Sequence, residues 1–166
     1  MKNKTTHLIR LARKKDIEQL VDLQVEFEKF FIKIGSSKPY KINRISRKKD
    51  IIDLNFAKNH IMRTIVAEND EKRIVGKISF YKGYLAEVPP YYIFRLSGVF
   101  VDEKSRGLGL SKMMLGKLFE IAKKENIKSI SWSVWGKNKS AVKFYENIGA
   151  KYYESEYDEH YMFIDV

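Results

Sequence analysis

A glycine-rich turn with the sequence R-G-L-G-L-S carries residue types that bind phosphate groups. Its Arg106, Gly107 and Gly109 lie between an apolar run that ends at Val101 and a helical pattern that begins near Leu110. The first N–H groups of a helix lack partners within the helix and carry partial positive charge, so they attract anions. Glycine lets the backbone approach a ligand without a Cβ, and arginine adds a charge-assisted donor. The turn therefore predicts a phosphate or pyrophosphate site, with an ordinary tight turn as the alternative.

The spacing of this turn differs from two common nucleotide-binding motifs. It lacks the third glycine of the dinucleotide-binding fingerprint, and no Gly-Lys-Ser/Thr triplet follows it, as a P-loop requires. The sequence therefore favours neither a Rossmann domain nor a P-loop protein.

A second stretch with residues suited to chemistry runs from Asn138 to Ala150. Asn138 is suited to cap a short helix, and Gly149 is suited to end it. The apolar positions of that helix that would face the core are Ala141, Phe144 and Ile148. Tyr145 has no evident structural role there, because a buried tyrosine hydroxyl requires a partner. Tyr145 is therefore a candidate for chemistry.

Hydrophobic periodicity predicts the elements that position these two stretches. The expected strands are His7–Ala12, Ile61–Glu68, Arg73–Tyr84, Tyr91–Val101, Lys128–Trp135, Lys151–Ser155 and His160–Asp165. The expected helices run from about Ile17 to Ile34, Arg47 to Asn59, Leu110 to Lys124 and Asn138 to Asn147. Asp16 and Gln19 resemble a capping box for the first helix, and a polar loop is expected over residues 36–49. This order favours a mixed, mostly antiparallel sheet with helices on both faces.

Length and composition favour one domain over residues 1–166. The absence of cysteine excludes a disulfide framework, a cysteine nucleophile and a thiolate metal site, and it suits a reducing compartment. His7, His60 and His160 show no metal-ligand spacing, so no metal is expected. We find neither a signal pattern nor an apolar segment long enough to cross a bilayer, so we expect a cytoplasmic protein without membrane partners.

The net charge of +11 could suit nucleic acid, an anionic membrane or an anionic cofactor. Residues 1–66 contain 16 Lys or Arg against seven Asp or Glu, whereas residues 151–166 contain one Lys against five acids. Most of the positive charges are interpreted as a solvated surface. The acidic C-terminal segment stands out against them.

Together, the two stretches resemble the GNAT N-acetyltransferase superfamily. That family carries an Arg/Gln-x-x-Gly-x-Gly/Ala turn after its fourth strand and, roughly thirty residues later, an Asn-x-x-Ala-x-x-Phe-Tyr-x-x-x-Gly-Ala/Phe helix. The residues that match in order and spacing are Arg106, Gly109, Asn138, Ala141, Phe144, Tyr145, Gly149 and Ala150. The resemblance implies a six- to seven-stranded sheet with about four helices, in which the strands ending at Val101 and near Trp135 splay apart.

The resemblance also implies acetyl-CoA as the donor and a primary amine as the acceptor. Backbone groups of Val99, Phe100 and Val101 would pair with the pantetheine arm. The pyrophosphate would be held by the N–H groups of Gly107, Leu108, Gly109, Leu110 and Ser111, beside Arg106. Asn138 would contact the CoA arm, and Tyr145 would protonate the departing thiolate.

Two positions depart from the family pattern. Ser111 stands where Gly or Ala is preferred, and the strand Tyr91–Val101 has no carboxylate, whereas several members keep a glutamate there as a base or amine ligand. Arg95 and Ser97 occupy that region instead. The candidates left open for the general base are Glu87, Glu154, Glu156, Asp158 or a water relay.

The acceptor pocket of the family is shaped by the first two helices and the loop between the last strands. Here these contribute Phe27, Phe30, Phe31 and Tyr40, and the acidic segment from Tyr152 to Glu159. Aromatic walls with nearby carboxylates suit a cationic amine, which favours a small, polyamine-like acceptor over a protein N-terminus or lysine.

Three other interpretations stay open. The basic cluster Arg44, Arg47, Lys48 and Lys49 could bind RNA or ribosomal protein, although no aromatic RNA-recognition motif accompanies it. The chain could also bind CoA without turnover, or assemble as a homodimer.

Overall fold

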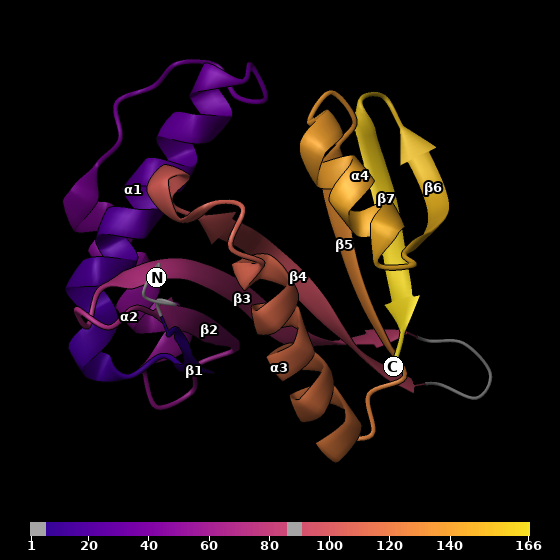
Figure 1. The fold of residues 1–166 in the computed structure, drawn as a ribbon, viewed down its shortest axis with the longest axis horizontal. Helices are drawn as coiled ribbons and strands as arrows, with labels where there is room; N and C mark the ends of the chain where they lie inside the picture. The colour runs from indigo at the N-terminus through magenta and orange to yellow at the C-terminus, as the bar shows by residue number, and fades with distance from the viewer. Residues whose placement is uncertain (1–5, 86–90) are drawn as a thin grey trace, which may run out of the picture. The chain divides into compact units, whose positions relative to one another are not determined.

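The computed structural model describes residues 6–85 and 91–166 (Figure 1). In these ranges the strands are β1 (Leu8–Leu11), β2 (Met62–Glu68), β3 (Ile74–Leu85), β4 (Tyr91–Val101), β5 (Ser129–Trp135), β6 (Lys151–Glu156) and β7 (Glu159–Asp165). The α-helices are α1 (Ile17–Lys33), α2 (Arg44–Asn55), α3 (Leu110–Lys124) and α4 (Lys139–Asn147). Short 3-10 turns precede α1 at Lys14–Asp16 and follow β4 at Glu103–Ser105. The predicted order of elements is confirmed.

The strands form one seven-stranded sheet in the order β1-β2-β3-β4-β5-β7-β6. The β1–β2, β5–β7 and β6–β7 pairs are antiparallel, and β4 pairs with β5 in parallel. A parallel neighbour is expected here, because α3 connects β4 to β5 as a crossover helix. The predicted mixed, mostly antiparallel sheet with four helices is therefore confirmed.

The parallel pairing of β4 with β5 is short. It joins Ile93–Arg95 to Ser129–Ser131, whereas the next two residues of β4, Leu96 and Ser97, have no register partner on β5. By contrast, β5 stays paired with β7 over its whole length, Ser129–Trp135. The two strands thus share three register pairs before their pairing ends, as the expected splay requires.

Two compact units make up the chain. The first unit comprises Met1–Phe80 and Gly98–Leu118, and the second comprises Tyr81–Ser97 and Phe119–Val166. The end of β4, the glycine turn and the start of α3 belong to the first unit. All of β5, α4, β6 and β7 belong to the second.

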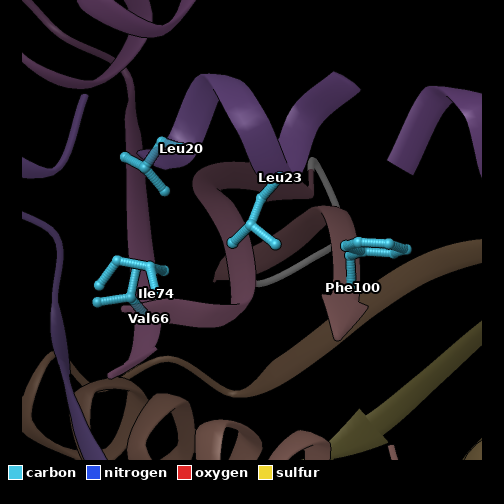
Figure 2. Packing of buried hydrophobic residues seen from close by; sticks show 5 residues of the cluster. All are labelled: Leu20, Leu23, Val66, Ile74 and Phe100. Carbon is cyan, nitrogen blue, oxygen red and sulfur yellow. The ribbon is translucent and has the colours of Figure 1, made fainter. Parts of the chain in front are cut away.

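The core of the first unit is built from α1 and the three strands β2, β3 and β4. Figure 2 shows its central side chains turned toward one another: Leu20, Leu23, Val66, Ile74 and Phe100. The apolar stripe of α1 supplies the two leucines, as the helical spacing in the sequence predicts. Phe27 and Phe30 pack against the same cluster. These two rings, predicted as acceptor walls, therefore also stabilise the core.

The predicted capping box of α1 is wrong. The Asp16 carboxylate instead accepts hydrogen bonds from Arg10 Nη1 and Nη2 at 2.7 and 2.9 Å. Arg10 also donates to Glu68 at 2.5 Å, and all three side chains are buried. Gln19 accepts from the Ile74 N–H at 2.8 Å. The buried guanidinium requires paired carboxylates, and this requirement overrides the local capping preference of Asp16.

The second helix begins at Arg44 and ends at Asn55, so both predicted ends lie too late in the chain. Asn43 causes the early start, because its side chain accepts a hydrogen bond from the Ser46 N–H at 3.1 Å. The polar loop expected over residues 36–49 is correspondingly shorter.

Candidate functional site

The predicted phosphate-binding turn follows β4 and its short 3-10 turn. Gly107 and Gly109 both adopt left-handed conformations, with φ of +79° and +75°. A Cβ built at either position would meet nothing within 4 Å. Backbone conformation, and not crowding, therefore favours glycine at these two positions.

The backbone N–H groups of residues 107–111 are free donors. No acceptor within residues 6–85 and 91–166 takes a hydrogen bond from any of them. Two other helices differ, since Asn43 and Asn138 accept hydrogen bonds from N–H groups in the first turns of α2 and α4. The N-terminus of α3 thus presents unpaired amides and a partial positive charge, which suit an anion.

Buried neighbours anchor this turn at both ends. Leu110 places its side chain in the core, and Phe100 and Val101 do so before the turn. The Asp102 N–H donates to the Val75 carbonyl oxygen at 2.9 Å, which fixes the end of β4 against β3. Since the side chains of Phe100 and Val101 are occupied with packing, only their backbone groups are available to a ligand.

Arg106 braces the turn within the first unit. Its Nε donates to the Val101 carbonyl oxygen at 3.2 Å. Its guanidinium lies 5.0 Å from the ring centre of Phe30 and 5.7 Å from that of Phe100. The side chain therefore holds the glycine turn to the end of β4 and to the aromatic face of α1. Direct contact of Arg106 with a phosphate stays a prediction.

A pocket of about 660 Å³ lies in the first unit beside this brace. It is bounded by α1, by the turn between β2 and β3, and by residues 100–106. Both signs of charge line it: the cations are Lys29, Lys33, Arg73, Lys104 and Arg106, and the acids are Asp22, Glu26, Asp102 and Glu103. This near balance of charges favours no single class of ligand.

The side-chain amide of Asn138, in the second unit, caps a helix with its oxygen and has a free donor at its nitrogen. Its Oδ1 accepts from the Ala141 N–H at 3.3 Å and from the Ser140 hydroxyl at 3.1 Å, which caps α4 as predicted. Its Nδ2 group has no hydrogen-bond partner among the described residues. The amide hydrogens are therefore available for the predicted contact with a ligand.

Tyr145 lies on α4 and is 7% exposed. Its ring packs 4.7 Å from that of Trp132 and 5.3 Å from that of Phe144, measured between centroids. Its hydroxyl has no hydrogen-bond partner in the part of the chain that the structure describes. Burial raises the pKa of this hydroxyl above its ordinary value, so Tyr145 keeps its proton at neutral pH. It is thus a protonated, unpartnered donor, as its predicted role requires.

The candidates for the general base are not brought together. Arg95 and Ser97 lie on β4, and Glu87 lies outside the described residues. Glu154 and Glu156 are exposed on β6. The Asp158 carboxylate accepts a hydrogen bond from Lys137 Nζ at 2.8 Å. The identity of the base stays open.

A buried polar network under α1 was missed by the sequence reasoning. The Glu28 carboxylate accepts from Gln24 Nε2 at 2.9 Å, from Arg47 Nε at 2.5 Å and from the Tyr40 hydroxyl at 2.7 Å. Gln24 Oε1 in turn accepts from Lys77 Nζ at 2.5 Å. The available signal was the spacing of Gln24 and Glu28 at four and eight residues after the core residue Leu20, on one face of the helix.

The pKa values of the two charged residues in this network, Glu28 and Lys77, are shifted for different reasons. Desolvation works against the charged form of Glu28, but the three donors outweigh it and hold the pKa of its carboxyl below the ordinary value. Desolvation lowers the pKa of Lys77, which is 6% exposed, to about 8. The Tyr40 hydroxyl, predicted to line the acceptor pocket, is instead used in the hydrogen bond to Glu28.

The two predicted walls of the acceptor pocket belong to different units. Phe27 and Phe31 form an edge-to-face pair with ring centroids 4.6 Å apart in the first unit. The acidic segment is the exposed β6–β7 hairpin of the second unit, where Tyr157 is 98% exposed and the Tyr152 hydroxyl donates to Glu146 at 2.5 Å.

The described residues contain no group of three or more His, Cys, Asp or Glu side chains arranged to hold a metal ion. Within the same residues, no helix combines the length and the apolar character needed to span a membrane.

Solved structures of similar fold include three acetyltransferases. The chain is 22% identical to an acetyltransferase of the GNAT family from Staphylococcus aureus Mu50, with 96% of this chain and 99% of that chain covered and a TM-score of 0.73. It is 15% identical to the PaiA N-acetyltransferase from Thermoplasma acidophilum in complex with coenzyme A, with 97% and 99% covered and a TM-score of 0.73. An acetyltransferase from Thermus thermophilus is 20% identical, with 97% of both chains covered and a TM-score of 0.73.

These structural similarities establish the fold. No curated protein sequence matches the chain significantly. The model of the acetyltransferase (GNAT) family matches residues 17–150, which include both the glycine turn and the Tyr145 helix. The chain therefore belongs to the GNAT acetyltransferase family.

Proposed function

We propose that the chain transfers the acetyl group of acetyl-CoA to the primary amine of a small cationic acceptor, with residues 1–166 acting as one catalytic domain. The observation that carries this proposal is the run of unpaired N–H groups at residues 107–111, at the start of a helix in a GNAT acetyltransferase. Such a run binds a diphosphate without needing a cationic side chain.

The donor is held mainly by backbone groups. The N–H groups of Gly107, Leu108, Gly109, Leu110 and Ser111 bind the pyrophosphate. Backbone groups of Val99, Phe100 and Val101 pair with the pantetheine arm as an added strand would. The free Nδ2 group of Asn138 donates to the same arm. The CoA complex of the Thermoplasma acidophilum structure supports a CoA ligand for this fold.

The chemistry is a direct transfer without an enzyme-bound intermediate, which suits a chain that has no cysteine. The acceptor ammonium first loses a proton to a base or to water. Its nitrogen lone pair then forms a bond to the thioester carbonyl carbon, and the carbonyl oxygen becomes an oxyanion that backbone N–H groups stabilise. Collapse breaks the carbon–sulfur bond, and the sulfur leaves with the electron pair.

Tyr145 supplies the proton for the leaving sulfur. Its hydroxyl is protonated at neutral pH and has no competing partner among the described residues. Proton transfer yields CoA thiol and a transient phenolate, which regains the proton that the amine released through solvent. The products are the amide, CoA thiol and a restored enzyme.

A cationic acceptor is supported by the charge of the β6–β7 hairpin. This hairpin carries Glu154, Glu156, Asp158 and Glu159 in a chain whose net charge is +11. A protein N-terminus or lysine is the alternative acceptor, and RNA binding without catalysis is the alternative function.

The test is a Tyr145→Phe variant, with Tyr84→Phe as its matched control because Tyr84 is an exposed tyrosine of the same unit. Release of CoA thiol is followed over a panel of amines, and CoA binding is measured by thermal stabilisation. Loss of general-acid catalysis lowers kcat about 100-fold or more, while CoA binding is retained. Stabilisation by CoA without thiol release from wild type would indicate a non-catalytic CoA-binding protein. Equal kcat for wild type and Tyr145→Phe would refute the acid role of Tyr145.

A further inference from the structure

The Trp132 indole nitrogen is a buried donor without an acceptor. Trp132 lies on β5 and is 2% exposed, and its Nε1 has no hydrogen-bond partner among the described residues. An indole N–H can only donate, so it cannot be satisfied by a neighbouring donor. Orphaned buried donors are rare, and each one requires an explanation such as stored strain, a catalytic role, or a bound water or ion.

The position of this donor indicates what it could bind. The Trp132 ring packs 4.7 Å from the Tyr145 ring, and the Tyr145 hydroxyl is also unpartnered. Trp132 directly follows Ser131, the last residue of β5 with a register partner on β4. The two rings, from β5 and α4, are therefore in contact just beyond the point where the pairing of β4 with β5 stops, and their polar groups are not hydrogen-bonded to each other.

Tyr145 alone is poorly suited to the proton transfer assigned to it. A thiol has an ordinary pKa of about 8.5 and a phenol one of about 10, so the transfer is uphill even in water. Burial raises the pKa of Tyr145 further, and no charged group in the described structure offsets this effect. A hydrogen bond to the phenolate oxygen would lower the barrier, because hydrogen bonds to charged oxygens are stronger than neutral ones.

We propose that Trp132 is a positioning residue for acetyl transfer, whose indole N–H donates to the Tyr145 hydroxyl oxygen as that hydroxyl passes its proton to the CoA sulfur. This inference rests on the proposed function. In the step, the Tyr145 O–H bond breaks, a hydrogen–sulfur bond forms on the departing thiolate, and the phenolate oxygen keeps the electron pair. The Trp132 N–H bond stays intact throughout, and the phenolate is reprotonated by the proton that the amine released.

The kinetic test is a double-mutant cycle between Trp132→Phe and Tyr145→Phe. Phenylalanine keeps an aromatic ring beside Tyr145 but removes the donor. Trp135→Phe is the control, because Trp135 is the other tryptophan of the chain and lies on the same strand. Single-turnover rates and the KM for acetyl-CoA are measured for each variant.

The expected loss for Trp132→Phe is about 10- to 100-fold in the single-turnover rate, the usual value of one hydrogen bond to a charged group. The KM for acetyl-CoA should change less than twofold. In the Tyr145→Phe background, Trp132→Phe should cause no further loss, since its only catalytic partner is already absent. Trp135→Phe should match the wild type.

The outcomes separate this inference from the function on which it rests. If Tyr145→Phe leaves the rate unchanged, the acid role of Tyr145 fails, and with it the proposed function as written. If Tyr145→Phe slows the reaction but Trp132→Phe does not, or if their losses multiply, Trp132 has no part in the proton transfer and the function stands.

A second measurement does not depend on whether Trp132→Phe folds. The two tryptophans give two indole N–H signals in a ¹H–¹⁵N spectrum, and Trp135→Phe assigns them. With CoA bound, the Trp132 signal should move downfield in the wild type as its N–H gains an acceptor, and it should not move in Tyr145→Phe. The same CoA-induced shift in both proteins would overturn the inference.

Discussion

Replacing Lys77 by methionine should stabilise the protein at neutral pH. Lys77 is buried on β3, and its ammonium has one hydrogen-bond partner among the described residues, Gln24. The difference between its ordinary pKa of 10.5 and about 8 in the folded protein corresponds to a penalty of about 3 kcal/mol for the charged form. The variant leaves the Gln24 oxygen without its partner, which costs about 1 kcal/mol. We therefore expect a net gain of about 2 kcal/mol in the free energy of unfolding at pH 7.

The pH dependence has a definite sign. Between pH 8 and 10.5 the unfolded chain binds more protons at Lys77 than the folded chain does, so the stability of the wild type rises with pH across this window. Above it the lysine is neutral in both states, and the penalty disappears. The advantage of Lys77→Met should thus fall from about 2 kcal/mol at pH 7 and change sign at about pH 10, where the remaining penalty for the charged form equals the cost of the lost hydrogen bond.

The assay is urea unfolding at several pH values. We choose circular dichroism as the signal because α1 and α2, which lie in the first unit with Lys77, contribute strongly to it. Tryptophan fluorescence is less suitable, because both tryptophans lie in the second unit. Lys82→Met, at an exposed position of the same strand, is the control and should show no such pH-dependent gain. A Lys77→Met protein less stable than wild type at pH 7, or a stability difference that stays constant from pH 7 to 10.5, would refute the reasoning.

Three further predictions concern single positions. Ser131→Ala removes a buried hydroxyl that has no partner, so we expect it to stabilise the second unit by about 1 kcal/mol relative to the exposed control Ser133→Ala, measured by tryptophan fluorescence in urea. Gly109→Ala imposes a left-handed conformation on alanine at a cost of about 1–2 kcal/mol and should weaken CoA binding. The control Gly116→Ala, in the open interior of α3, should stabilise the helix by up to about 1 kcal/mol and leave CoA binding intact. Equal CoA affinities of the two variants, measured by calorimetry, would contradict this prediction. Arg10→Met leaves the buried Asp16 and Glu68 carboxylates without their cation and should lower the free energy of unfolding by about 3–5 kcal/mol. Urea unfolding followed by circular dichroism measures this loss, and a change of less than about 1 kcal/mol would disprove the prediction.

Local sequence signals predict the elements well where packing and turn chemistry agree. The apolar stripe of α1, the turn with Gly107 and Gly109 and the Asn138 cap are all present as expected. These features depend on residues close together in the chain, which is why spacing alone reveals them.

Long-range pairing explains most of what local signals missed. Asp16 has the chemistry of a helix cap, but its carboxylate binds Arg10 instead, and Arg10 also binds Glu68 on β2. The network of Lys77, Gln24 and Glu28 joins β3 to α1 in the same way. No window of the sequence brings Arg10 together with Glu68, or Gln24 together with Lys77, so these contacts require the fold.

The candidate site, like the fold, could be predicted only where its residues form local motifs. The glycine turn and Tyr145 belong to compact motifs with fixed spacing. Trp132 does not, because its missing partner is a property of its surroundings and not of its sequence neighbours.

Gln24 gives the first unit a directional lock. Its carbonyl oxygen faces the Lys77 ammonium, and its NH₂ group faces the Glu28 carboxylate. Turning the amide over would set two donors against each other at one end and two acceptors at the other, so only one orientation is tolerated. Because Gln24 and Glu28 both lie on α1, the bond that a slip of this helix by one residue along the sheet would break is the one from Lys77 on β3. The first helix is thereby held in a single rotational setting, at the expense of burying charge that aliphatic side chains would avoid.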